Sequence, residues 1–310
     1  ITPDGKYAYV GNKPCSASTG SGSVFVVDLK NNVLLGSPIA VGQCPKGIDG
    51  IAATPNGQEV WATSYSGVAP ISVIDTSTNT VVATVSLNGG LATAIALSPD
   101  GKTAYVTFRD PVNGNLTAII DTATRAITGT VAGSGDYVAV DPSGALYLSF
   151  GPSLSKVGGP SMFVQCTAGP ILFKADGTAY LLDSECGEIY HITPSLGIID
   201  IIQHPALPPS YGPPFSFGMS PDGQFLIWSD GKQIVEISTT NDAVVPTAAL
   251  GLNPIQAVAV APMNTPVGPG SLQVQPSDLN GGGTPVTVTF TGVTQEGFTS
   301  LKISSTGPNP

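Results

Sequence analysis

The chain has few charged residues and no long apolar run, and each shortage excludes a class of function. Only 10% of its 310 residues are charged, and 11 Lys and Arg against 21 Asp and Glu give a net charge of -10 without a basic cluster. Binding to nucleic acid or to an anionic membrane is therefore disfavoured. No apolar run reaches the roughly 18 to 20 residues of a membrane-spanning helix, so we expect no membrane span.

Several sequence signals are also missing. There is no initiator Met and no signal peptide, which we interpret as a mature or trimmed chain. The catalytic and phosphate-binding motifs GxSxG, HExxH, GxGxxG with a distant acid, and the P-loop are absent. CxxC and CxxH spacings are absent as well. We therefore predict no cofactor and no metal, with a structural cation such as calcium as the alternative.

Glycine and proline, by contrast, are abundant, with 38 and 28 residues. Many of them lie in a recurring turn, found as TPDG, TPNG, SPDG, DPSG, KADG and SPDG, that starts at residues 2, 54, 98, 141, 174 and 220. Pro presets φ for the first corner of such a turn, and Gly takes the positive φ that closes it. We therefore interpret the acidic residues of these turns as structural.

Four short apolar runs surround each turn with the spacing of strands. In the second repeat they are GIAAT, EVWATSY, ISVID and TVVATVSL, between residues 50 and 87. The third repeat gives TAIAL, TAYVTF, LTAIID and AITGTV. Four strands per unit of roughly 40 residues predict an all-β protein, a β-propeller of four-stranded blades.

The stretches SPDGKTAYVT (98–107) and ISVIDTSTNTVVATV (71–85) resemble the YVTN family of β-propeller repeats. The resemblance covers roughly residues 1–262 and implies the propeller fold. The chain departs from the pattern in the fourth repeat, where SLSKV is a poor third strand, and in the fifth, where KADG replaces SPDG.

The first repeat lacks its inner strand, of which only Ile1 remains, and VAVAPMN (258–264) is an inner strand without a blade. We expect residues 257–261 to join the first blade and close the ring, because an open ring exposes sheet edges. This gives a propeller domain of six blades over residues 1–262. If residues upstream of Ile1 have been removed, seven or more blades are the alternative.

Residues 263–270 are predicted to be a linker, and residues 271–310 a partial β-sandwich-like module. The segment VTVTFTGVTQEGFTSLKISSTGP resembles the start of an immunoglobulin-like module seen after repeat domains in large secreted bacterial proteins. Three strands make a poor independent core. The module is therefore either cut short or completed by strand addition from a neighbouring subunit.

The four cysteines are predicted to lie on one face of the propeller, in connections between strands. Their economical pairing is Cys15 with Cys44 and Cys166 with Cys186, one of three connectivities. Disulfides imply an oxidising compartment, so we predict an extracellular or cell-surface protein. A metal site is the rival interpretation.

Asn115 begins an Asn-Leu-Thr sequon, a possible glycosylation site in a predicted loop.

Few residues are candidates for chemistry. His191 lies in a predicted strand, which favours a side chain packed or exposed within the blade over a catalytic one, and His204 precedes a proline-rich loop on the cysteine face. Asp49, Asp136 and Tyr137 are placed at the channel mouth by their positions at inner-strand starts. The related streptogramin lyases use a histidine pair and a metal, which cannot be matched here. Aromatic residues recur in the second strands, which indicates packing between blades: Trp61, Tyr105, Tyr147, Tyr180 and Trp228.

These patterns favour a non-enzymatic extracellular binding or assembly module, part of a larger surface-displayed or polymeric protein. Its partners would be other protein subunits or surface components, with self-association through residues 271–310. The irregular loops 109–115 and 205–214 are further candidates for contact. The alternative is a propeller lyase or hydrolase acting on a small molecule or glycan, with Asp49, Asp136 and His204 converging at the central cleft. A scaffold for intracellular partners is disfavoured by the cysteine pairs.

Overall fold

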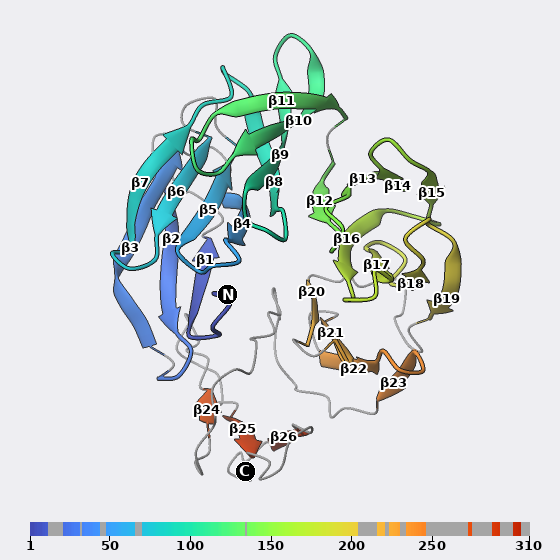
Figure 1. The fold of residues 1–310 in the computed structure, drawn as a ribbon. Coiled ribbons are helices and arrows are strands. Elements are labelled where there is room, and N and C mark those ends of the chain that lie inside the picture. Colours follow the sequence, from blue (N-terminus) through green and yellow to red (C-terminus); the bar gives the residue numbers. More distant parts are fainter. Residues whose placement is uncertain are drawn as a thin grey trace.

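Residues 7–245 fold into six antiparallel sheets placed around a common centre (Figure 1). The computed structural model describes residues 1–11, 21–31, 33–43, 48–65, 70–133, 135–203, 216–220, 223–229 and 234–245, and the short strands 272–274, 287–291 and 300–304. In each of the six sheets the strands are hydrogen-bonded in sequence order. This is the blade of a β-propeller. We number the blades 1 to 6 along the chain.

Blade 1 has three described strands, which correspond to the second, third and fourth strands of the other five blades, and those five have four each. Blade 1 is formed by β1 (Tyr7–Gly11), β2 (Ser21–Asp28) and β3 (Val33–Gln43). Blade 2 is formed by β4 (Ile48–Ala53), β5 (Glu59–Ser64), β6 (Ile71–Asp75) and β7 (Thr80–Val85). Blade 3 is formed by β8 (Leu91–Leu97), β9 (Thr103–Asp110), β10 (Gly114–Asp121) and β11 (Ile127–Ala132). Blade 4 is formed by β12 (Tyr137–Val140), β13 (Leu146–Phe150), β14 (Ser153–Lys156) and β15 (Ser161–Phe163). Blade 5 is formed by β16 (Ala168–Phe173), β17 (Ala179–Asp183), β18 (Ile189–Ile192) and β19 (Ile198–Ile202). Blade 6 is formed by β20 (Ser216–Met219), β21 (Phe225–Ser229), β22 (Ile234–Ser238) and β23 (Ala243–Val245). The poor third strand expected in blade 4 is formed as β14.

The recurring turn joins the first and second strands of a blade as predicted. All six of its glycines, from Gly5 to Gly223, have positive φ. In the Thr- or Ser-initiated turns the hydroxyl accepts the backbone N–H five residues on, as Ser98 does from Thr103 at 3.0 Å. A further hydrogen bond to this turn comes from the residue after the third strand, where the Thr122 hydroxyl donates to the Gly101 carbonyl at 2.6 Å. The conserved geometry of these turns keeps the blades alike despite their different sequences.

The core lies between the blades. Four clusters of buried apolar side chains fill the boundaries of blades 1 and 2, 2 and 3, 4 and 5, and 5 and 6. Among the described residues, none of these clusters crosses from blade 3 to blade 4. The contact there is made by the innermost strands, with β12 packed beside β8. Of the five boundaries between consecutive blades, the one between blades 3 and 4 is therefore built differently.

A separate sheet follows the propeller, with the order β24 (Leu272–Val274), β25 (Thr287–Thr291) and β26 (Ser300–Ser304). The three strands predicted for the tail are thus formed. Residues 257–261 lie outside the described residues, so closure of the ring by this segment stays a prediction. Within the described part of the chain, no helix has the length and apolar character needed to cross a membrane.

Candidate functional site

The pairing of Cys166 with Cys186 is confirmed, since the two form a disulfide that joins blades 4 and 5. Cys166 follows β15, and Cys186 lies in the β17–β18 turn. Cys15 and Cys44 lie outside the described residues, so their pairing stays a prediction. The confirmed bond closes a loop with a sequence separation of 20 residues.

The buried Asp183 holds both ends of this disulfide. Its carboxylate accepts the backbone N–H of Cys166 at 2.8 Å and that of Thr167 at 2.9 Å. It also accepts the N–H of Cys186 at 3.3 Å. One carboxylate thereby organises two loops that are far apart in sequence. Buried backbone donors need such partners, which explains a buried acid here without any catalytic role.

Asp183 and the two cysteines are also the one group of potential metal ligands found among the described residues, with ligand atoms within 4.8 Å of one another. The two sulfur atoms are bonded to each other, and a disulfide lacks the thiolates that bind zinc. The carboxylate is occupied by backbone donors. We therefore interpret the group as a structural staple.

His191 lies in β18 and is buried, as the sequence favoured. Its Nδ1 is 2.7 Å from the Asp242 carboxylate of blade 6, and its ring stacks on Tyr180 with centroids 4.4 Å apart. Its Nε2 is buried and has no partner among the described residues. A histidine acting as a general base must reach its substrate. A ring enclosed in this way fits a role in joining two blades.

The same Asp242 takes part in a contact that recurs around the ring. A second-strand aromatic of one blade reaches the outer turn, between the third and fourth strands, of the next blade. We call this contact the latch. The Tyr180 hydroxyl donates to Asp242 at 2.6 Å, Tyr9 to the Asn79 side chain at 2.6 Å, and Tyr147 to the Pro194 carbonyl at 3.1 Å.

In the latch between blades 2 and 3, the Arg125 guanidinium lies 5.2 Å from the centroid of the Trp61 ring. Arg125 also pairs with Glu59, which accepts the Trp61 indole N–H at 3.1 Å. Asn79, Arg125 and Asp242 all have positive φ, with values of 55°, 63° and 54°. The tight outer turn is what aims each of these side chains at the preceding blade.

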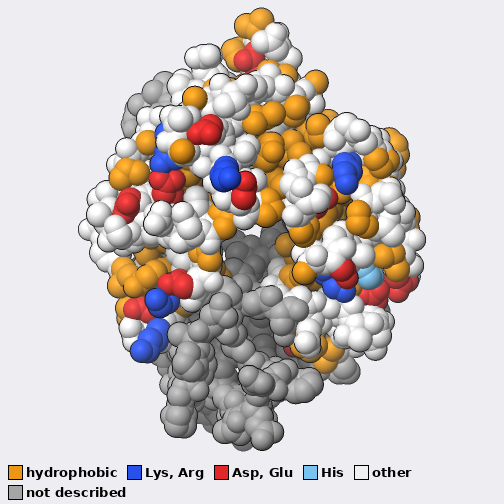
Figure 2. Space-filling model, viewed as in Figure 1, with side chains coloured by type: hydrophobic (Ala, Val, Ile, Leu, Met, Phe, Trp, Pro, Cys, Tyr) orange, Lys and Arg blue, Asp and Glu red, His pale blue; other side chains and the backbone are white. Residues whose placement is uncertain are grey.

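The latch is missing between blades 3 and 4. Tyr105 occupies the aromatic position, but no hydrogen bond joins its hydroxyl to a described residue. The positive-φ position of the facing turn is Gly158, which has no side chain to offer. Tyr105 and Ile119 are consequently half-buried, and Phe150 and Phe163 of blade 4 are exposed. Figure 2 shows apolar side chains gathered where these two blades face each other.

Of the second-strand aromatics predicted to be core residues, Trp61, Tyr147 and Tyr180 are buried, whereas Tyr105 is only half-buried, because no latch covers it. Trp228 is buried too, but its direction differs from the others. It packs back against blade 5 with Ile189 and Ile202, whereas the latch aromatics face the following blade. The reason is its position in the strand: Ile227 is equivalent to Trp61, and Trp228 lies one residue further along, so its side chain points to the opposite face of the sheet.

The predicted channel-mouth residues lie on or beside innermost strands. Asp49 is in β4, Asp136 is exposed just before β12, and Tyr137 is the first residue of β12. Strand β8 lies between β4 and β12, since it packs beside both. Burial, and next the adjacent Asp136 carboxylate, raise the pKa of Tyr137. His204 lies outside the described residues, so its convergence with these groups stays a prediction.

Asn115 lies in β10 and not in a connecting loop, because β9 and β10 run close to each other before a tight turn at 111–113. The expected irregular loop 109–115 is thus a regular hairpin. Asn115 pairs with Arg109 and is exposed, so glycosylation there stays a prediction. The loop 205–214 lies outside the described residues.

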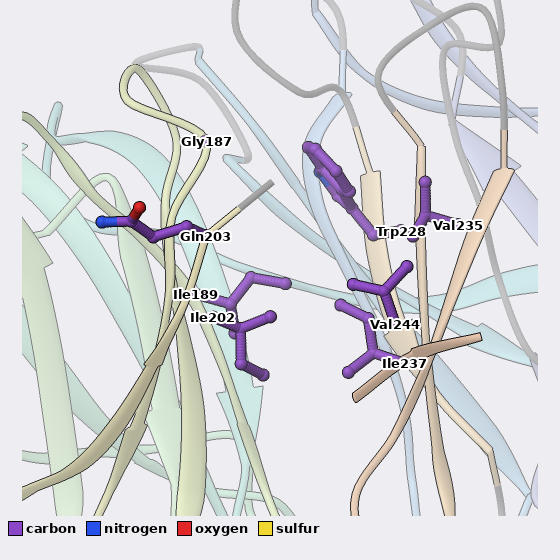
Figure 3. Close-up of a pocket in the computed structure, with 8 residues that line it drawn as sticks. All are labelled: Gly187, Ile189, Ile202, Gln203, Trp228, Val235, Ile237 and Val244. Carbon is purple, nitrogen blue, oxygen red and sulfur yellow. The ribbon is translucent and has the colours of Figure 1, made fainter. Parts of the chain in front are cut away.

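A small apolar pocket lies between β18–β19 and β21–β23, in the boundary of blades 5 and 6 (Figure 3). Ile189 and Ile202 face Trp228, Ile237 and Val244 across it. Its described lining offers few polar groups to orient a ligand, in contrast with typical small-molecule sites. We interpret it as loose packing between blades.

An exposed apolar surface lies along the outer edge of blade 5. The last strand, β19, is hydrogen-bonded to β18 on one side only within the described residues. Ile198, Ile199 and Ile201 are 52%, 50% and 39% exposed. Large aliphatic side chains on an unpaired edge strand favour pairing with a strand of another chain. Sequence reasoning missed this site because IIDII resembles a buried strand.

No protein-family model matches the sequence, and no curated protein matches it. Among solved structures, Kuenenia stuttgartiensis hydrazine synthase has a TM-score of 0.65 at 18% identity, covering 84% of this chain and 88% of the other. The β-propeller domain of Cps50 (Swd1) from Myceliophteria thermophila also has a TM-score of 0.65, at 10% identity over 85% and 89%. At these identities the likeness concerns the fold alone. The chain is a β-propeller.

Proposed function

We propose that this chain is a non-enzymatic extracellular module for binding or assembly, within a larger surface-displayed or polymeric protein. The observation that carries the proposal is the exposed apolar edge of β19. Soluble monomers usually blunt such edges, and an edge left open fits strand addition by a partner. The Cys166–Cys186 disulfide supports an oxidising, extracellular compartment.

The enzymatic alternative needs Asp49, Asp136 and His204 to converge. Asp49 and Asp136 lie on opposite sides of β8, and no observation of the described residues favours a reaction at the centre over assembly at the edge. YVTN membership remains part of the proposal, resting on the repeat sequences. The immunoglobulin-like character of the tail rests on its sequence and its three strands.

The test compares the full chain with a triple variant, Ile198→Thr, Ile199→Thr and Ile201→Thr, which keeps strand propensity but removes apolar surface. Light scattering after size exclusion, over a concentration series, should show assembly of the native chain and a monomeric variant. Val82→Thr with Ile127→Thr, at exposed positions on β7 and β11, is the matched control and should assemble normally. A native chain that stays monomeric at every concentration would contradict the proposal.

A further inference from the structure

Two edge strands of this chain have the same length and complementary sequences. β19 is IIDII (198–202), and β26 is SLKIS (300–304). Each has a single charged residue at its centre with aliphatic neighbours, Asp200 in one and Lys302 in the other. β26 is the last strand of its sheet and is paired with β25 on one side only within the described residues.

Lys302 is a rare residue in its region. It is the only Lys or Arg after Lys232, so residues 233–310 contain no other cationic side chain of these types. A single cation in the middle of an edge strand favours pairing with a strand that places an acidic residue directly opposite. The match with Asp200 is therefore not a by-product of a generally basic tail.

Asp200 makes pairing of β19 with a second β19 unfavourable. IIDII is symmetric, and antiparallel pairing of two copies about its centre would set two Asp200 carboxylates opposite each other. Like charges directly opposite destabilise a strand pair. The edge is thus protected against self-pairing but open to a strand with a central cation.

We propose that β26 of one copy adds antiparallel to β19 of a second copy, with Lys302 opposite Asp200. In this register Leu301 is opposite Ile201, and Ile303 is opposite Ile199. The proposal rests on the assembly function and names its partner, a second copy of this chain. Because two different strands meet, the contact is heterologous. Each added copy pairs through one of its two edge strands and leaves the other available for the next copy. Repetition gives a ring or an open filament.

Charge reversal tests the pairing. Asp200→Lys and Lys302→Asp should each weaken association of the full chain roughly ten-fold, because each replaces an attraction by a repulsion. The double variant should assemble like the native chain. An equimolar mixture of the two single variants should also assemble, since each then supplies the other's counterpart. Glu185→Lys and Lys30→Asp, at exposed turn positions, control for charge alone and should have no effect.

The outcomes separate this inference from the proposed function. A native chain that assembles, together with single variants that assemble equally well, overturns the pairing and leaves the assembly function standing. A native chain that never assembles overturns both. Pairing within one chain is tested by Asp200→Cys with Lys302→Cys, which should give a disulfide between two molecules on a non-reducing gel. A disulfide within a single molecule would contradict the proposed exchange between copies.

Discussion

The Tyr180 hydroxyl and the Asp242 carboxylate are joined by a 2.6 Å hydrogen bond across the boundary of blades 5 and 6. Asp242 also accepts from His191 Nδ1, so two side chains of blade 5 depend on one turn of blade 6. Burial, and next the Asp242 carboxylate, raise the pKa of Tyr180, which therefore remains a protonated donor. Related contacts at three other boundaries make this latch a repeated element of the ring.

Removing the hydroxyl should cost stability where the latch exists and nothing where it does not. Tyr180→Phe leaves the largely buried Asp242 carboxylate short of a donor and should lower the free energy of unfolding by about 1–2 kcal/mol. Tyr105→Phe is the matched control and should change it little, since this hydroxyl bonds no described residue. Urea unfolding followed by circular dichroism measures both. Equal losses in the two variants would disprove the distinction.

The boundary between blades 3 and 4 should tolerate truncation better than a latched one. Ile119 and Ile120 are neighbours in β10, but Ile120 is fully buried toward blade 2 and Ile119 is half-buried toward blade 4. Ile120→Ala should cost about 3–4 kcal/mol, and Ile119→Ala about 1 kcal/mol. Because the two residues are of the same type and lie in the same strand, the difference between their losses of stability measures how tightly each of the two boundaries is packed. Similar losses would show that the two boundaries are packed alike.

Loss of the disulfide should destabilise the blade 4–5 region. Cys166→Ser with Cys186→Ser removes a cross-link spanning a sequence separation of 20 residues, which in the chain-entropy account is worth about 3 kcal/mol. Thermal unfolding of the double variant should resemble that of the native chain in reductant. A double variant as stable as the oxidised native chain would contradict this prediction.

Asp141 should contribute to the loss of stability in acid. Burial opposes ionisation of Asp141, but hydrogen bonds from Ser143, Ala145 and Tyr147 outweigh it and lower its pKa below the ordinary value of 3.8. A carboxyl with a lowered folded-state pKa stabilises the protein above its ordinary pKa, and this contribution is lost as pH falls below it.

Asp141→Asn should therefore be less stable than the native chain at pH 7, by about 1–3 kcal/mol, and the difference should shrink on acidification from about pH 5 to pH 3. Urea unfolding midpoints across this range provide the measurement. Parallel pH curves for the two proteins would assign the acid sensitivity to other groups.

Much of the fold could be predicted because its signals are local. The Pro-Gly turns and alternating strands specify each blade, and the close spacing of Cys166 and Cys186 indicated their pairing. The latch partners escaped prediction because Asn79, Arg125 and Asp242 share a backbone conformation and no side-chain chemistry. Trp228 was assigned to the common aromatic position, but it lies one residue further along its strand and therefore points to the other face.

The exposed edge of β19 escaped prediction for another reason. Four isoleucines around one aspartate have the composition of a buried strand, and only the position of β19 at the end of its sheet exposes Ile198, Ile199 and Ile201. Whether a strand is an edge depends on what is packed beside it in space. No pattern within the strand itself contains that information.

The latch also bears on how such a ring can gain or lose members by gene duplication. A repeat with both halves of the latch brings an aromatic side chain for its successor and an outer turn for its predecessor, so a duplicated copy of such a repeat inserted next to its parent would restore both contacts at once. A break within a repeat would separate the two halves and leave an aromatic without its turn. Whole repeats are therefore the unit that duplication can add or remove with least disturbance.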